Sequence, residues 1–146
     1  MTKLDKAHRL VVVCDGAKAI LLADAGTALV PRLSVLETHD EPHPSTAALG
    51  TDRPGRGHES APTPRSATEE TDLHAQAEAA FLGRVAARIG VMVEAGTAPE
   101  RILLVAPPRA LGTLRGALSA KGRVDGEIAK DLVMLPVEEI SRHIAA

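Results

Sequence analysis

Two apolar runs near the start of the chain constrain its fold most strongly. Residues 8–14 and 17–24 consist largely of Val, Leu, Ile and Ala, and the dipeptide Asp15-Gly16 joins them. Aspartate followed by glycine adopts the positive φ angles of a tight hairpin turn, so we expect the two runs to pair as antiparallel strands. Alternating apolar residues after Pro31 predict a third strand, which should lie at an edge because proline cannot donate to a central ladder.

Helical spacing begins in the second half of the chain. Between Leu73 and Val93, apolar residues recur three or four positions apart, which predicts a helix of about six turns. Ser66 and Glu69 fit a capping box at its start, and Gly96 should end it.

The rest of the chain alternates between strand and helix patterns. Residues 101–108 predict a buried strand that stops at two prolines, and Pro108 suits the first turn of a short helix. A short strand over 124–128 and a last helix opening at Pro136 complete the order β-β-β-α-β-α-β-α. With right-handed crossovers, this order predicts a three-layer α/β fold with a mixed five-stranded sheet of order 3-2-1-4-5, strand 2 antiparallel. That is the ribonuclease-H-like architecture.

Length and composition favour a single domain spanning residues 1–146. Phe81 is the only aromatic residue, so the core must be built from aliphatic side chains. Cys14 is the only cysteine, which excludes an internal disulfide and suits a reducing compartment. The apolar run at residues 10–14 is too short for a signal peptide or a membrane span. We therefore expect a cytoplasmic protein that does not engage membranes, and its oligomeric state stays open.

Residues 40–68 form the least foldable stretch of the sequence, with five of the ten prolines and three glycines. A loop of this length inside a compact domain is usually functional or disordered. Pro54 restricts the residue before it and Gly55 permits a turn, so residues 51–56 should fold as a lid over the carboxyl end of the sheet. The alternative is a solvated loop whose charges pair with one another. The candidate contact residues of the loop are Thr51, Asp52, Arg53, Arg56 and Arg65.

The segments GTDRPGR, RSATEETDLH, ILLVAPPRALGTLR and PVEEI occur in an order that resembles the bacterial host attachment protein family, described as required for attachment to host cells. The resemblance runs from about residue 9 to the C-terminus, and the opening CDGAKAILL is similar to the first strands of that family. The family is in turn similar to the middle domain of archaeal and eukaryotic peptide-chain release factors. The resemblance implies the same architecture and an association with tRNA or the ribosome.

Release factors carry a Gly-Gly-Gln tripeptide on the loop between the third strand and the long helix. Here that loop is residues 40–68, which contain no Gly-Gly-Gln; the nearest stretch is Gly55-Arg56-Gly57-His58. Without the glutamine that positions water, peptidyl-tRNA hydrolysis is not expected. The resemblance therefore implies a binding role.

A binding crevice is expected where strands 1 and 4 lie side by side, because their connections leave in different directions. Asp15 follows the first of these strands, and the Pro107-Pro108-Arg109 turn follows the other. Amide groups of the helix after Pro108, together with Arg109 and Lys18, would favour an anion such as a phosphate-bearing ligand. The equally weighted alternative is that Asp15 only makes a turn and the prolines only end a strand.

Basic residues gather in one segment, although the formal net charge of the chain is −2. Residues 101–124 contain no acidic residue and five basic ones, namely Arg101, Arg109, Arg115, Lys121 and Arg123. Contacts from Arg109 and Arg115 to phosphates would give salt-dependent RNA binding. With Phe81 in the core, no aromatic platform is left for base stacking, so such binding should recognise shape. A protein partner through which attachment is regulated is the second hypothesis.

Catalytic and metal sites find little support in the sequence. A two-metal nuclease of this fold needs carboxylates on strand 1, near the long helix and on strand 4, and Asp15 with Glu69 or Glu70 fits the first two places. Strand 4 supplies no carboxylate. The substitutes would be Asp125, Glu127 or Asp131. No zinc spacing is matched by His39, His43, His58 and His74. We therefore predict a protein without catalytic residues, metal or cofactor.

Overall fold

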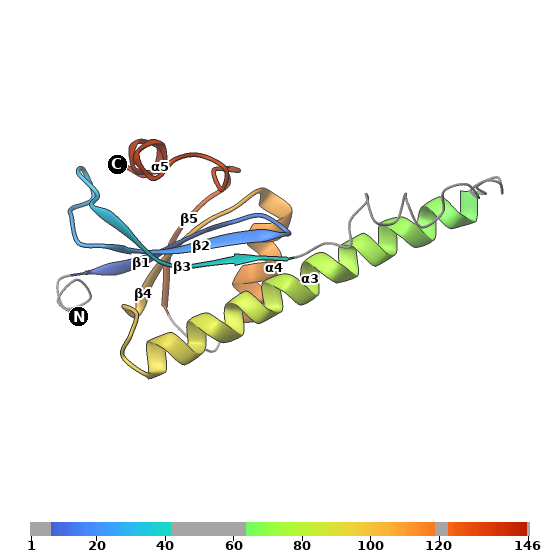
Figure 1. Cartoon of the computed structure of the whole chain (residues 1–146), viewed down its shortest axis with the longest axis horizontal. Coiled ribbons are helices and arrows are strands. Elements are labelled where there is room, and N and C mark those ends of the chain that lie inside the picture. Colours follow the sequence, from blue (N-terminus) through green and yellow to red (C-terminus); the bar gives the residue numbers. More distant parts are fainter. Residues whose placement is uncertain (1–6, 42–63, 119–122, 146) are drawn as a thin grey trace.

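A computed structural model describes residues 7–41, 64–118 and 123–145 of the chain. Its elements are β1 (Arg9–Cys14), β2 (Lys18–Asp24), β3 (Leu33–Asp40), α3 (Pro64–Glu94), β4 (Arg101–Val105), α4 (Pro108–Leu118), β5 (Arg123–Ile128) and α5 (Val137–Ile144). One sheet lies between α3 and α4 on one face and α5 on the other (Figure 1). The predicted order of strands and helices is confirmed.

The five strands form one mixed sheet with the order β3-β2-β1-β4-β5. β2 pairs antiparallel with both β1 and β3, whereas β1, β4 and β5 run parallel. The structure thus confirms the α/β fold and the strand order expected from the sequence, including the edge position of β3. β1 and β2 are buried over almost their whole length, as expected for central strands with helices on both faces.

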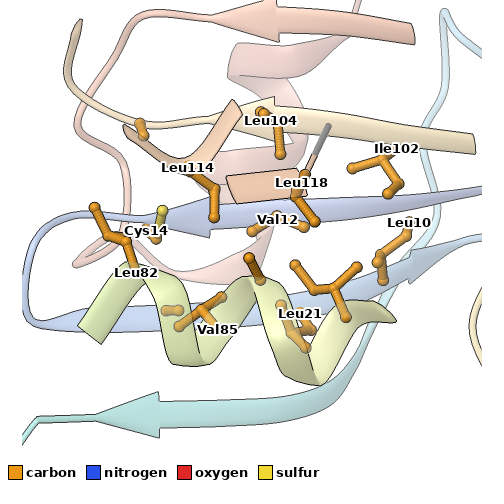
Figure 2. Packing of buried hydrophobic residues seen from close by; sticks show 14 of the residues in the cluster. Leu10, Val12, Cys14, Leu21, Leu82, Val85, Ile102, Leu104, Leu114 and Leu118 are labelled. Atoms are coloured by element: carbon orange, nitrogen blue, oxygen red, sulfur yellow. The ribbon is translucent and has the colours of Figure 1, made fainter. Parts of the chain in front are cut away.

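Two aliphatic clusters fill the spaces on either side of the sheet. Successive side chains of a strand point to opposite faces, so the even-numbered residues of β1 pack against α3 and α4 while Val11 and Val13 pack toward α5. Figure 2 shows the first cluster, where Leu82 and Val85 of α3 lie over β1 and β2. Each strand of the centre therefore contributes to both cores, and Phe81 joins the first of them.

β1 and β2 form the predicted antiparallel hairpin, but the turn between them differs from the predicted one. It has three residues, 15–17, and Gly16 does not have a positive φ; among the described residues only Gly96 does. Oδ1 of Asp15 instead accepts hydrogen bonds, both 2.8 Å long, from the amides of the two residues that follow Gly16. Because the aspartate side chain itself closes the turn, no left-handed backbone is required.

α3 is 31 residues long, and its N-terminal part extends beyond the sheet (Figure 1). It begins at Pro64, so the prediction that the loop reaches residue 68 is wrong at that boundary. Proline is preorganised for a first helical turn, and the Ala and Glu residues that follow favour helix even without an apolar face. Ser66 and Glu69 accordingly lie inside the helix and do not cap its start.

The C-terminal end of α3 agrees with the prediction. Gly96 adopts a φ of 78°, and its amide donates to the carbonyl of Val93 at 3.1 Å. A glycine in the left-handed region directly after a helix is a common C-terminal cap. Neither α3 nor any other helix in the described ranges is long and apolar enough to span a membrane.

A buried carboxylate fixes the loop between β2 and β3. Asp24 is fully buried; its Oδ1 accepts hydrogen bonds from the amides of Gly26 and Arg32, and its Oδ2 accepts one from Nε of Arg9 at 2.8 Å. Burial by itself raises the pKa of this carboxyl, but the hydrogen bonds from Arg32, Gly26 and Arg9 outweigh burial and hold the pKa below its ordinary value. Asp24 thus ties both ends of the loop to β1.

Candidate functional site at the carboxyl edge of the sheet

The register of the parallel strands defines one edge of the sheet. A single row of paired residues crosses these strands at Val13, Val105 and Ile128. Two residues beyond this row lie Asp15 after β1, Pro107 after β4 and Lys130 after β5. The backbone holds the last two segments together, because the amide of Ala106 donates to the carbonyl of Ile128 at 3.1 Å. The predicted juxtaposition of Asp15 with Pro107 at one edge follows from this register.

Asp15 has a structural task at this edge. Besides closing the turn through its side chain, its amide donates to the carbonyl of Lys18 at 2.9 Å. These bonds orient the carboxylate toward its own turn. They leave Asp15 as a positioning residue of the β1–β2 connection, which is the simpler of its two predicted roles.

The start of α4 carries the exposed cation of the site. β4 ends at Val105, three residues before the end of the predicted strand, and α4 begins at Pro108. The carbonyl of Pro107 accepts from the amide of Leu111 at 2.8 Å, which fixes the first turn. Arg109 is exposed in that turn, and its carbonyl accepts a hydrogen bond from the Thr113 hydroxyl at 3.3 Å. Its guanidinium has no hydrogen bond or ion pair with another described residue, and no acidic residue accompanies it in the turn.

Arg115 is not equivalent to Arg109, although the sequence predicted phosphate contacts for both. Its Nη1 lies 2.7 Å from Oε1 of Glu127 on β5. Similarly, Nε of Arg101 lies 2.6 Å from Oδ2 of Asp125. Two arginines of the basic segment are therefore already paired with carboxylates of the neighbouring strand. Lys121 and the side chain of Arg123 lie outside the described part of the chain.

Acidic side chains approach the same edge from α3 and β3. A Cβ at Gly16 would lie 2.6 Å from Cγ of Glu78, so α3 crosses the β1–β2 turn at close range. Glycine at position 16 therefore permits the close approach of Glu78, and it does not serve a positive φ. Lys18 faces Asp40 across the β2–β3 ladder. Lys18 thus lies beside a carboxylate, whereas the first turn of α4 holds no acidic residue beside Arg109.

Ion pairs join the edge strand β3 to α3. Arg88 donates from Nε to both carboxylate oxygens of Glu37 at 3.0 Å, and Arg84 pairs with Glu41. His39 lies 2.9 Å from Glu37 as well. The hydrogen bond from Arg88 is the main cause that lowers the pKa of Glu37 below its usual value. We call these contacts the β3–α3 clamp.

Most of the predicted loop residues cannot be placed. Thr51, Asp52, Arg53 and Arg56 lie outside the described residues, and so does the proposed lid. Arg65 belongs to the first turn of α3, but its side chain is also outside the description. The lid stays a prediction.

Two of the carboxylates considered for a nuclease already pair with arginines. Asp125, the third residue of β5, pairs with Arg101, and Glu127 pairs with Arg115. Asp131 directly follows Lys130 at the carboxyl edge. Across residues 7–41, 64–118 and 123–145, no group of three His, Cys, Asp or Glu side chains is arranged to hold a metal ion. The side chains of Glu69 and Glu70 lie outside that description.

Lys130 is a member of this edge that the sequence reasoning missed. It is exposed two residues after β5, and its amide donates to the carbonyl of Ile128 at 3.0 Å. The rule that parallel strands end at the same edge of a sheet predicts this position once it is applied to β5 as well as to β1 and β4.

The layers, the sheet order and the polar carboxyl edge define an α/β domain with a candidate ligand-binding edge. The chain belongs to the family described as protein required for attachment to host cells, whose model matches residues 10–144. This match confirms the host attachment family that the sequence motifs suggested. Among curated proteins, no match was found.

Proposed function

We propose that the protein is a non-enzymatic binding module that associates with structured RNA, in tRNA or in the ribosome. One observation carries the proposal: in the first turn of α4, the guanidinium of Arg109 is paired with no other residue that the structure describes. Lys18 and Lys130 flank it along the carboxyl edge of the sheet. A partner with phosphates at matching positions would supply the anion that Arg109 lacks within the described chain.

The chemistry of this edge suits phosphate better than a base. Unsatisfied amides at a helix N-terminus attract anions, and arginine can bind two phosphate oxygens at once. Phe81, the only aromatic residue, is 3% exposed and is unavailable for stacking. Recognition would therefore depend on the spacing of phosphates in a folded RNA.

The resemblance to release-factor middle domains supports the same ligand class, and an RNA ligand implies a cytoplasmic location. Because the Gly-Gly-Gln tripeptide is missing from the sequence, the proposal includes no hydrolysis of peptidyl-tRNA. We also expect purified protein with Mg²⁺ or Mn²⁺ to cut neither RNA nor an RNA–DNA hybrid. Metal-dependent cleavage that disappears in Asp15→Asn would contradict this part of the proposal.

Ribosome co-sedimentation at low and moderate salt tests the proposal. The wild-type chain should bind at low salt and lose affinity steeply as salt rises, since RNA binding releases counterions. Arg109→Ala and Lys130→Ala should each weaken binding by roughly tenfold and lower the salt slope by about one. Arg32→Ala is the matched control, because this exposed arginine lies at the opposite edge of the sheet. Absence from ribosomal fractions at both salt concentrations, or an equal loss in the control, would reject RNA as the ligand.

A protein partner is the second candidate, and the loop between β2 and β3 favours it. Leu29 and Val30 are 72% and 65% exposed at the tip of this loop. The tip is ordered, because Thr27 and Val30 exchange a backbone and a side-chain hydrogen bond of 3.0 Å each. An ordered apolar tip suits an apolar pocket on another protein. Leu29→Ser with Val30→Ser should abolish capture of such a partner from lysate, whereas Met134→Ser should not.

A further inference from the structure

The face of α3 that points away from the sheet carries a regular row of exposed residues. At 100° per residue, this row is centred about 120° around the helix from the core-facing side chains Phe81, Val85 and Ile89. Leu73 and Val91 near its ends are 62% and 54% exposed, and all members between them are exposed. We call this row the α3 seam; its members are Leu73, Ala77, Ala80, Arg84, Ala87 and Val91.

The N-terminal half of the seam has little tertiary support. Side chains 72–80 are exposed, apart from the half-buried Ala75, because this part of α3 extends beyond the sheet (Figure 1). Glu78 reaches the β1–β2 turn at Gly16, but among the α3 side chains that the structure describes no core residue precedes Phe81. Helical segments owe most of their stability to the packing of an apolar face. A projecting helix with an apolar outer face is therefore expected to pack against another element.

The spacing of the seam matches a second copy of itself. Its members alternate at intervals of four and three residues, the pattern that lets two helices pack along a continuous seam. In an antiparallel pair with a twofold axis near Leu82, Leu73 faces Val91 of the second copy and Ala77 faces Ala87. The two large residues thus pack on each other at both ends, and alanines at the centre allow close approach.

The centre of such a pair also accommodates its one charged member. Arg84 would lie beside Ala80 of the second copy, and its guanidinium is already paired with Glu41, the residue that follows β3. Its aliphatic stem can then cover the alanine while the charged end stays in water. Gly83, next to the seam, offers further room, since a Cβ built there meets no atom within 4 Å.

Charge selects the antiparallel orientation. Residues 64–80 of α3 contain four acidic residues and one basic residue, whereas residues 81–94 contain two arginines and one glutamate. Because Arg84 and Arg88 already pair with Glu41 and Glu37, the second half carries no excess positive charge. An antiparallel pair keeps the acidic half of each helix away from the acidic half of the other copy. A parallel pair would instead place like charges side by side, which is unfavourable.

We propose that the α3 seam is a homodimer interface, in which two copies pack α3 antiparallel about a twofold axis near Leu82. This inference is independent of the RNA proposal. The seam spans roughly 27 Å at 1.5 Å per residue, which is short for a permanent interface. The dimer should therefore be weak and concentration-dependent.

Sedimentation velocity of the full chain tests the interface. From about 1 to 300 µM, a range that spans weak affinities, the wild-type chain should shift from monomer toward dimer. In the double variant Leu73→Glu with Val91→Glu, two carboxylates would face each other at each end of the seam. Dimerisation should therefore weaken at least tenfold. Met134→Glu is the matched control, because Met134 is 75% exposed outside α3. Circular dichroism should show unchanged folding in both variants, since all three positions are exposed.

Cysteine cross-linking tests the orientation. Equimolar Ala77→Cys and Ala87→Cys chains should form a mixed disulfide dimer under mild oxidation, identified by its linked peptides. Ala77→Cys alone should not, because in the antiparallel pair its two copies are about 15 Å apart along the axis, beyond the reach of a disulfide. A chain that stays monomeric at every concentration would overturn the proposal. So would unchanged dimerisation in the double-glutamate variant, or efficient cross-linking of Ala77→Cys with itself.

Discussion

Asp24 shows how a single buried carboxylate organises a loop. It receives hydrogen bonds from two amides and from Arg9, and the pairing is sheltered from solvent. Asp24→Asn keeps an acceptor for the amides but removes the charge that Arg9 requires. We expect a loss of about 2 kcal/mol in the free energy of unfolding, in the range for hydrogen bonds to charged groups. Urea unfolding at pH 7 measures it, and Glu139→Gln, which breaks an exposed pair with Arg142, should cost under about 0.5 kcal/mol.

The same residue should make stability depend on acid pH. The pKa of Asp24 is lower in the folded than in the unfolded chain, so the folded state binds fewer protons there. Its contribution is complete above the unfolded pKa of about 3.9 and is lost as pH falls through the folded pKa. The stability difference between wild type and Asp24→Asn should therefore narrow on acidification from pH 5 toward 2. A constant difference over this range would show that the charge of Asp24 is not the cause.

Cys14 is expected to be chemically silent in the folded protein. Burial raises the pKa of its thiol to about 12, and the neighbouring charge of Asp15 adds to the increase. Since the thiolate is the reactive form, alkylation by iodoacetamide at pH 8 should be at least about a hundredfold slower in the native than in the denatured chain. Mass spectrometry after timed quenching measures both rates. Rapid native labelling would mean that the end of β1 opens frequently.

Sequence reasoning located residues well where strand order alone decides their place, and less well where register decides it. Asp15 and Pro107 share an edge because β1 and β4 are parallel neighbours, as predicted. The predicted two-residue turn, however, would pair Cys14 with Ala17 and therefore Arg9 with Leu22, whereas the observed register pairs Cys14 with Ala19 and Arg9 with Asp24. Because of this shift in register, the sequence reasoning missed the buried ion pair between Arg9 and Asp24. The turn is closed by hydrogen bonds to the Asp15 side chain, and the residue pattern alone does not show that these bonds form.

At the level of elements, the β3–α3 clamp holds an edge strand to the long helix. Both pairs are partly exposed, so each should contribute little to stability and respond to salt. Arg84→Ala with Arg88→Ala should lower the free energy of unfolding slightly in low salt, and by less in 0.5 M NaCl. A double-mutant cycle between Glu37→Gln and Arg88→Met isolates one pair. Coupling that does not change with salt would contradict this account.

Elements were predicted most reliably where an apolar pattern specifies them. The core half of α3 was recognised from its spacing, but the sequence of its first residues, from Pro64, shows no apolar periodicity. β4 ends at Val105, before Pro107, because its last paired residue is set by β5. Helix propensity and strand pairing decide these boundaries, and apolar spacing reports neither of them directly.

For the molecule as a whole, the sheet couples two cores into one cooperative unit. Val12 belongs to the α3 core while its neighbours Val11 and Val13 belong to the α5 core, so neither core can loosen without disturbing β1. We expect Ile89→Ala and Ile140→Ala, which create cavities in opposite cores, each to destabilise the chain by about 3 kcal/mol.

Because both cores share the same strands, each substitution should lower one common unfolding transition. Circular dichroism at 222 nm and amide hydrogen exchange can be compared for this purpose, since exchange reports α3 and α5 separately. Coincident loss of protection in both helices supports a single folding unit. The contrary result is that Ile140→Ala removes the exchange protection of α5 while α3 and the sheet keep the protection of the wild type. In that case α5 unfolds independently, and the coupling through β1 is too weak to unite the two cores.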